Sequence, residues 1–306
     1  MLTLLASMLM GGMVCWLLFG ALTTLCYRFI RQPLLTTEPD QASKLILGWL
    51  ALPPLAALLI TLVMYSPDLS QWLVAGHCHQ GNCRQHGPQS HLTIWPAAAF
   101  MLWIGVRTGR CLFRQWLCVR QLSGTLSLTG QDLGPFVRLD NPEPAAFTLG
   151  WLAPKIYITA GMQSACSTEE IDCILAHERA HRRRRDNLRL LIARLLSAPL
   201  PQSWSAAVLA DLGLCCEKAS DLRAAREFSR ESVATALIRV ARLQQSRSPV
   251  GTMAFTGTQT ERRIRALLDE PVAPLGNEYV FAATSAALLF ILFIVNPLHR
   301  AIELIP

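Results

Sequence analysis

Two histidines four residues apart, His177 and His181, are the side chains of this 306-residue sequence best suited to share a metal ion. Four residues make about one helical turn, so on a helix both imidazoles project from the same face. Glu178 lies about a hundred degrees round that helix, close enough to meet a metal-bound water without binding the metal. Zinc lowers the pKa of such a water, and a neighbouring carboxylate can collect its proton. The spacing therefore predicts a hydrolytic Zn²⁺ site with Glu178 as the general base.

A zinc site of this type needs a third protein ligand. Glu217 and Asp221 lie one helical turn apart downstream. Glu217 can bind the metal, and Asp221 can accept a hydrogen bond from the outer nitrogen of a ligand histidine, which fixes the tautomer of the ring. Two acidic residues at this spacing more often form a solvated helix face. In the company of the upstream histidines, we interpret them as a ligand and its supporting carboxylate.

A helix that positions the histidines is predicted to begin at Ser167. Ser167 and Glu170 have the spacing of a capping box, and apolar residues at helical spacing lead from there to His177. The pattern runs to about Ser197, and Asp186 could cap a second helix after a break in this stretch. Later helices are predicted over about 204–227, 229–245 and 259–269.

Short β-like runs precede this helix. They are separated by turn residues and cover 125–129, 135–139, 145–149 and 155–159. The last run alternates apolar and polar side chains as a half-buried strand does. We predict a small antiparallel sheet, preceded by a helix over 107–122.

The composition is too apolar for an ordinary soluble protein, with 52% hydrophobic and 16% charged residues. Apolar residues gather in four blocks, at about 2–26, 45–65, 92–106 and 279–295. A helix of about 20 apolar residues crosses a bilayer, so all four blocks are predicted spans. The third block is the shortest. The first block lacks a basic leading region and is interpreted as a retained anchor rather than a signal peptide.

Basic residues give the predicted orientation. Of 28 Lys and Arg residues, only Arg84 and Arg300 fall outside the segments 27–44 and 107–278. The positive-inside rule assigns those two segments to the cytoplasm, and the amino terminus, loop 66–91 and the tail to the other side. The net charge of +7 is then a topology signal. No nucleic-acid-binding motif accompanies it, and no direct nucleic-acid partner is expected.

Several motifs together resemble the membrane-bound peptidase family of the BlaR and MecR antibiotic sensors. They are residues 146–159, 167–170, 175–181 and 184–188, then Glu217 with Asp221, and 262–268. The resemblance covers the whole segment 107–278 and agrees with four spans. It implies a polytopic α-helical protein of the bacterial plasma membrane with a cytoplasmic α+β domain of the gluzincin type. In that domain His177, His181 and Glu217 would bind zinc and Glu178 would act as the base.

The same resemblance implies a substrate-binding strand near 146–150. Its residues Phe147, Thr148, Leu149 and Gly150 are expected to pair with an extended substrate backbone. For stabilisation of the oxyanion, Arg223 and Arg226 are the candidates.

The sequence departs from the sensors at its end. They carry a penicillin-binding domain after the last span, whereas this chain ends at Pro306 without a Ser-x-x-Lys motif in the tail. We therefore do not expect this chain to sense β-lactams. Residues 198–204 also lack the aromatic, Asn-Pro-containing segment usual in the family.

Loop 66–91 holds four of the seven histidines. The residues of interest are His77, Cys78, His79, Cys83 and His86. Imidazole and thiolate together suit Cu(I) or Zn²⁺, which favours a metal sensor. A Cys78–Cys83 disulfide in an oxidising compartment is the alternative. The basic run 182–185 is interpreted as a contact with anionic lipid headgroups rather than with substrate.

These features predict an endopeptidase of transmembrane signalling. An extracytoplasmic stimulus would activate cleavage of a cytoplasmic protein, which the resemblance identifies as a transcriptional repressor, and of the chain itself. Membrane-protein quality control, as in HtpX-like peptidases, is the second enzymatic hypothesis. A non-catalytic metal receptor or carrier is the third, although binding alone would not require Glu178. The sequence does not indicate an oligomeric state.

Overall fold

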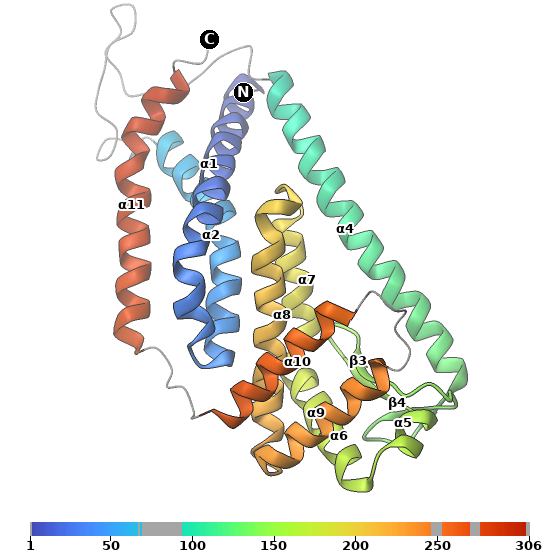
Figure 1. Cartoon of the computed structure of the whole chain (residues 1–306). Helices are drawn as coiled ribbons and strands as arrows, with labels where there is room; N and C mark the ends of the chain where they lie inside the picture. The colour runs from blue at the N-terminus through green and yellow to red at the C-terminus, as the bar shows by residue number, and fades with distance from the viewer. Residues whose placement is uncertain (1, 67, 69–93, 246–252, 270–275, 304–306) are drawn as a thin grey trace, which may run out of the picture.

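The chain folds into a mostly helical structure with one small sheet (Figure 1). The computed structural model describes residues 2–66, 68, 94–245, 253–269 and 276–303. Most of loop 66–91 lies outside these residues, including all of its metal or disulfide candidates His77, Cys78, His79, Cys83 and His86.

Two apolar helices form a hairpin at the amino-terminal end. They are α1 (Leu2–Leu35) and α2 (Pro39–Tyr65), and α2 continues through Pro53 and Pro54. The Glu38 carboxylate accepts a hydrogen bond from the Gln41 amide at the start of α2. By length and composition both helices are able to cross a membrane. The first two predicted spans therefore lie in suitable helices.

The third and fourth predicted spans lie in α4 (Ile94–Thr129) and α11 (Asn277–Glu303). Among the described residues, only α1 and α2 are long and apolar enough to cross a membrane, and α11 holds a shorter apolar stretch, Leu288–Pro297. Spans at these positions stay a prediction. The predicted helix over 107–122 is confirmed as part of α4, which runs diagonally from the far end of the hairpin to the sheet (Figure 1).

The sheet has four strands in the order β1-β2-β4-β3. They are β1 (Gly130–Asp132), β2 (Val137–Leu139), β3 (Ala146–Leu149) and β4 (Lys155–Thr159). The outer pairs are antiparallel, but β2 and β4 are parallel, so the prediction of an antiparallel sheet was wrong for the central pair.

The chain after β2 explains this difference. The Gly161 amide donates to the Asn141 carbonyl at 2.9 Å, which holds the connection beside the far end of β4. The chain then returns along the outer edge of β4 as β3. Alternation of apolar residues indicates which face is buried but not the direction of the neighbouring strand.

The first predicted strand, 125–129, was also wrong, because these residues complete α4. The Thr125 and Thr129 hydroxyls bond to carbonyls four residues earlier, at 3.1 and 3.2 Å. Bonds of this kind let threonine lie in a helix despite its preference for strands.

Six helices complete the second half of the described domain. They are α5 (Ala160–Ala165), α6 (Thr168–Arg184), α7 (Asp186–Ser197), α8 (Gln202–Ala224), α9 (Arg230–Gln245) and α10 (Met253–Leu268). The predicted capping box is present: Ser167 accepts from the Glu170 amide, and Glu170 accepts from the Ser167 amide. The break between α6 and α7 is confirmed, and Arg185 makes it in the left-handed conformation. Asp186 does not cap α7 with its side chain, contrary to expectation.

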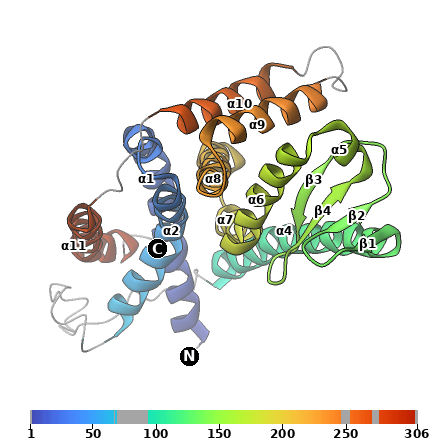
Figure 2. The same cartoon turned by 90° about the horizontal axis from the view of Figure 1, so that it is seen from below.

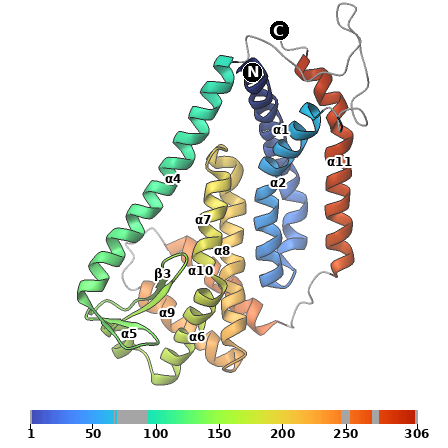
Figure 3. The same cartoon turned by 180° about the vertical axis from the view of Figure 1, so that it is seen from behind.

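Helices α7 and α8 stand between the α1–α2 hairpin and α4 (Figure 3). A buried cluster joins them to the hairpin, with Tyr27, Ile46, Ala193 and Leu212 among its members. On the other side, α6 covers one face of the sheet and α9 and α10 lie across α8 (Figure 2). The metal-site helices α6 and α8 are therefore held between the sheet and the apolar hairpin.

Candidate metal centre

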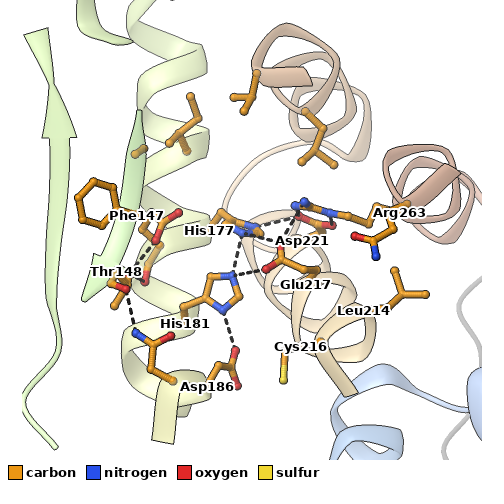
Figure 4. A pocket seen from close by; sticks show the side chains of 18 of the residues that line it. Phe147, Thr148, His177, His181, Asp186, Leu214, Cys216, Glu217, Asp221 and Arg263 are labelled. Atoms are coloured by element: carbon orange, nitrogen blue, oxygen red, sulfur yellow. Dashed lines mark hydrogen bonds and ion pairs between the residues drawn. The ribbon is translucent and has the colours of Figure 1, made fainter. Parts of the chain in front are cut away.

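Three predicted ligands converge between α6 and α8. His177 and His181 project from α6 towards Glu217 on α8 (Figure 4). The two Nε2 atoms are 2.9 Å apart, and each lies 3.5 Å from a Glu217 carboxylate oxygen. A tetrahedral zinc ion with bonds near 2.0–2.1 Å needs roughly 3.3 Å between its ligand atoms. The nitrogen and oxygen donors therefore fit zinc in both type and separation.

Small buried side chains allow the two helices to approach each other. Ala176 and Ala180 on α6 and Ala219 and Ser220 on α8 are all buried, and the helices pack together. Among the described residues, His177, His181 and Glu217 form the one group of three His, Cys, Asp or Glu side chains spaced to hold a metal.

Asp221 lies behind His177, beside the outer ring nitrogen with which a hydrogen bond was predicted. Its Oδ1 atom lies 2.8 Å from the ring Nδ1, and the carboxylate is fully buried. The ring N–H does not point along this contact, so it is an ion pair rather than an aligned hydrogen bond. Burial lowers the pKa of His177, but Asp221 and Glu217 outweigh it and raise the pKa to about 10. A metal ion entering this centre therefore replaces a proton.

Asp186 supports the second histidine. Its Oδ2 atom lies 2.8 Å from His181 Nδ1, and the Ser220 hydroxyl lies 3.2 Å from the same nitrogen. Burial raises the pKa of Asp186, but His181 and Arg184 outweigh it and hold the pKa below its ordinary value. The residue predicted as a helix cap is therefore the outer partner of His181, a predicted metal ligand. The sequence signal was a carboxylate placed directly after the end of the histidine helix.

Arg263 on α10 is a residue of this centre whose role was not predicted from the sequence. Its guanidinium donates to both Asp221 oxygens at 2.8 and 2.7 Å and lies 2.9 Å from Glu217. Burial raises the pKa of Glu217, but His177 and Arg263 outweigh it and keep the carboxyl ionised. The available signal was the need of the buried Asp221 carboxylate for a cation.

Arg223 and Arg226, the predicted oxyanion candidates, do not line the cavity of the metal centre. They line another cavity, together with the α1–α2 turn. The assignment was wrong because α8 and the turn that follows it carry these side chains away from the ligand face.

Glu178, the predicted base, is buried beside the strand β3. The Thr148 hydroxyl donates to Glu178 Oε2 at 2.7 Å. Asn187 on α7 donates to the main-chain oxygens of Thr148 and Gly150 at 2.8 and 3.2 Å. These bonds fix the strand, the base and the helix relative to one another.

A cavity of about 620 Å³ runs from β3 over the metal centre to α9 and α10. Of the predicted substrate-binding residues, Phe147 and Thr148 line it. Leu149 packs with Tyr157 in the cluster at β2 and β4, and Gly150 makes a turn with φ +107°. Neither is among the described residues that line the cavity.

The basic run 182–185 is not a uniform lipid-facing patch. Arg184 is buried and paired with Asp186 and Asp40. The lipid interpretation was wrong for this residue, because the last turn of α6 places its side chain in the interior between these two carboxylates. Arg183 lies 4.0 Å from Glu227 on the surface.

Comparison with known families agrees with this geometry. Residues 126–271 match the model of peptidase family M48. The match supports an M48 metallopeptidase domain in this segment and with it a proteolytic function; peptidases of this family are typically zinc-dependent. No curated protein and no solved structure matches the chain.

Proposed function

We propose that this chain is a membrane-embedded zinc endopeptidase of transmembrane signalling. It cleaves a cytoplasmic transcriptional repressor, and also itself, in response to an extracytoplasmic stimulus. The observation that carries the enzymatic part is the convergence of His177, His181 and Glu217, with Glu178 beside them on a cavity wall. Zinc bound by these three side chains would acidify a water molecule and polarise the scissile carbonyl.

The remaining chemistry belongs to the side chains of the chain itself. Glu178 is placed to take a proton from the attacking water and to deliver it to the leaving amine nitrogen. Thr148 holds Glu178 Oε2 at 2.7 Å and so restricts the rotation of the carboxylate. Arg263 keeps the Glu217 and Asp221 carboxylates charged and fixed.

The edge strand β3 supports binding of an extended polypeptide. The Thr159 amide donates to the Ala145 carbonyl, and the alternation of antiparallel bonds then turns the main-chain groups of Ala146 and Thr148 away from β4. The Thr148 carbonyl already accepts a hydrogen bond from the Asn187 side chain. A substrate strand would therefore pair beside Ala146, with side chains reaching the apolar part of the cavity at Val233 and Leu237.

The membrane part of the proposal rests on apolar helix surfaces. Besides the two helices able to cross a bilayer, α4 and α11 expose large apolar side chains, with Trp95 81% and Phe293 79% exposed. Exposed apolar surface of this extent favours contact with lipid. The end of α2 and the start of α4, which flank loop 66–91, lie at the opposite end of the hairpin from the α1–α2 turn (Figure 1). This arrangement agrees with a stimulus, such as a metal at that loop, acting across the membrane.

Membrane-protein quality control of the HtpX type is the second candidate, because the match to family M48 fits it equally well. The two candidates differ in the breadth of their substrates. One repressor is expected for signalling, and many misfolded proteins for quality control.

Substrate trapping tests the proposal. The Glu178→Gln chain would be crosslinked in membranes, and the retained proteins identified. The matched control is Glu178→Gln combined with His177→Ala, which lacks the metal site. We expect one repressor to be retained by the first variant and released by the control. Retention of many unrelated membrane proteins would favour quality control. If the wild-type chain bound zinc but cleaved none of the trapped or candidate proteins, a metal carrier would be favoured.

A further inference from the structure

A chain of buried polar contacts links the apolar hairpin to the metal ligand His181. Arg184, at the end of α6, pairs through Nη1 with Asp40 at the start of α2. Its Nε atom donates to Asp186 Oδ1 at 3.1 Å, and Asp186 Oδ2 lies 2.8 Å from His181 Nδ1. The contact path therefore leads from α2 to a metal-binding nitrogen through two intermediate side chains.

Because this path is largely buried, the position of Arg184 depends on each of its carboxylate partners. The Arg184 and Asp186 side chains are only 3% and 2% exposed, whereas Asp40 is 29% exposed. A buried guanidinium that loses one of its carboxylates must move or remain incompletely paired. Ser43 on α2 adds a weaker contact at 3.4 Å. Loss of Asp40 would therefore alter how Arg184 holds Asp186, and with it the orientation of the His181 ring.

We propose that Asp40 is a positioning residue for His181 and acts through Arg184 and Asp186. The geometry of a metal ligand then depends on how the α1–α2 turn is seated against α6 and α7. This inference rests on the proposed function, since it assumes that His181 binds zinc. It supplies a physical route by which displacement of the hairpin reaches the metal centre.

The structure offers two matched controls. Lys44 pairs with the same Asp40 at 2.8 Å, but from the exposed side. Arg31 on α1 pairs with Asp211 on α8 at 2.6 Å and so also docks the hairpin. The described contacts of Asp211 are with Arg31 and Tyr27 and do not reach a metal ligand. Removing the Arg31–Asp211 ion pair therefore shows the effect of weaker hairpin docking alone, because the contacts that lead to His181 stay unchanged.

Zinc affinity of the full chain in detergent, measured by competition with a chelator, tests the inference without any substrate. Loss of an outer partner of a metal-binding histidine typically weakens affinity 10- to 100-fold. We expect about 10-fold weaker zinc binding for Asp40→Asn, the low end of that range. Lys44→Gln should bind as the wild type does, and Arg31→Gln should lose thermal stability but not zinc affinity. Asp40→Asn combined with Asp186→Asn should bind as Asp186→Asn alone.

If the fold-losses of zinc affinity in the two single variants multiplied in the double variant, the inference would be overturned, because Asp40 would then act by another route. Equal losses in Arg31→Gln and Asp40→Asn would also overturn it. Should Asp40→Asn fail to fold, Asp40→Glu is expected to shift the absorption spectrum of the Co²⁺-loaded chain, and an unchanged spectrum would contradict the inference. Wild-type affinity in Asp40→Asn would refute this inference alone. A wild-type chain that binds no zinc would refute the proposed function as well.

Discussion

At the scale of single residues, Arg263 balances the negative charge of the carboxylates at the metal centre. Without it, the fully buried Asp221 would face only the ring of His177, and Glu217 only the rings of His177 and His181. Its guanidinium contacts both carboxylates through three nitrogen atoms. A planar fork of donors matches this task better than the single ammonium of lysine.

Arg263→Gln should therefore destabilise the zinc-free chain by about 3 kcal/mol, the size expected when one partner of a buried ion pair is removed. Arg263→Lys should recover part of the loss. Thermal unfolding with and without zinc checks this, with the exposed neighbour variant Arg262→Gln as the control. A loss no larger than in the control would show that the two carboxylates do not need this cation.

The positions proposed for catalysis were readable from the sequence because they obey helical spacing. His177 and His181 share a helix face, as do Glu217 and Asp221, and the structure brings both pairs together. Arg263 and Asp186 were missed in these roles. Arg263 reaches Asp221 across 42 residues of chain, which no local pattern reports. Asp186 follows a helix end, and its sequence position fits a cap as well as a ligand partner.

At the scale of elements, the junction between β4 and α5 sets the strand β3 beside the metal centre. Gly161 packs so closely on the Pro142 carbonyl that no Cβ fits there. The connection from β2 crosses the end of the sheet at this point and delivers β3 to the outer edge of β4. A side chain at this position would push the connection away from α5.

Gly161→Ala is therefore expected to destabilise the chain by about 3 kcal/mol, the upper part of the usual range for overpacking. It should also impair peptide cleavage, because β3 carries Thr148. Gly124→Ala, in an open position on α4, should instead be neutral or stabilise by up to about 1 kcal/mol. Thermal melts of both variants give the comparison. Equal stability of the two variants would contradict the role given to Gly161.

Helices were predicted better than strands, and the reason is physical. The capping box at Ser167 and the apolar spacing after it are local signals, and α6 begins where they indicated. The parallel pairing of β2 with β4 depends on a crossing held by a bond between Asn141 and Gly161, which follow the two strands and lie far apart from each other in the sequence. The run 125–129 has residues typical of strands but continues a helix already formed upstream.

At the scale of the whole molecule, the metal-site segment is docked along the apolar hairpin. Leu200, at the turn between α7 and α8, packs so closely on Gly20 of α1 that an added Cβ would lie 2.9 Å from Leu200 Cδ2. Arg107 on α4 donates to the Ala198 and Leu200 carbonyls at the same turn. The division into a membrane region and a cytoplasmic domain stays a prediction, and their packing was not predicted because long-range contacts leave no signal in local composition.

The predicted orientation can be checked in intact cells. A tag placed after Pro306 should be digested by protease added to spheroplasts, whereas segment 107–278 should be cut only in inverted membrane vesicles. The excess of Arg and Lys in that segment is the physical reason. A cytoplasmic protein serves as the control for sealed membranes. Protection of the tag in spheroplasts would contradict the four-span arrangement.

The most direct test of the central claim compares the wild type with Glu178→Gln in zinc content and peptide cleavage. The purified full chains would be assayed for bound zinc and for hydrolysis of an unfolded protein substrate. We predict one zinc per chain in both, because Glu178 is not a ligand, and a 10²- to 10⁴-fold lower cleavage rate in the variant, the usual contribution of a general base. Equal cleavage by both chains, or a wild type without bound zinc, would contradict the assignment of this site as a zinc peptidase centre.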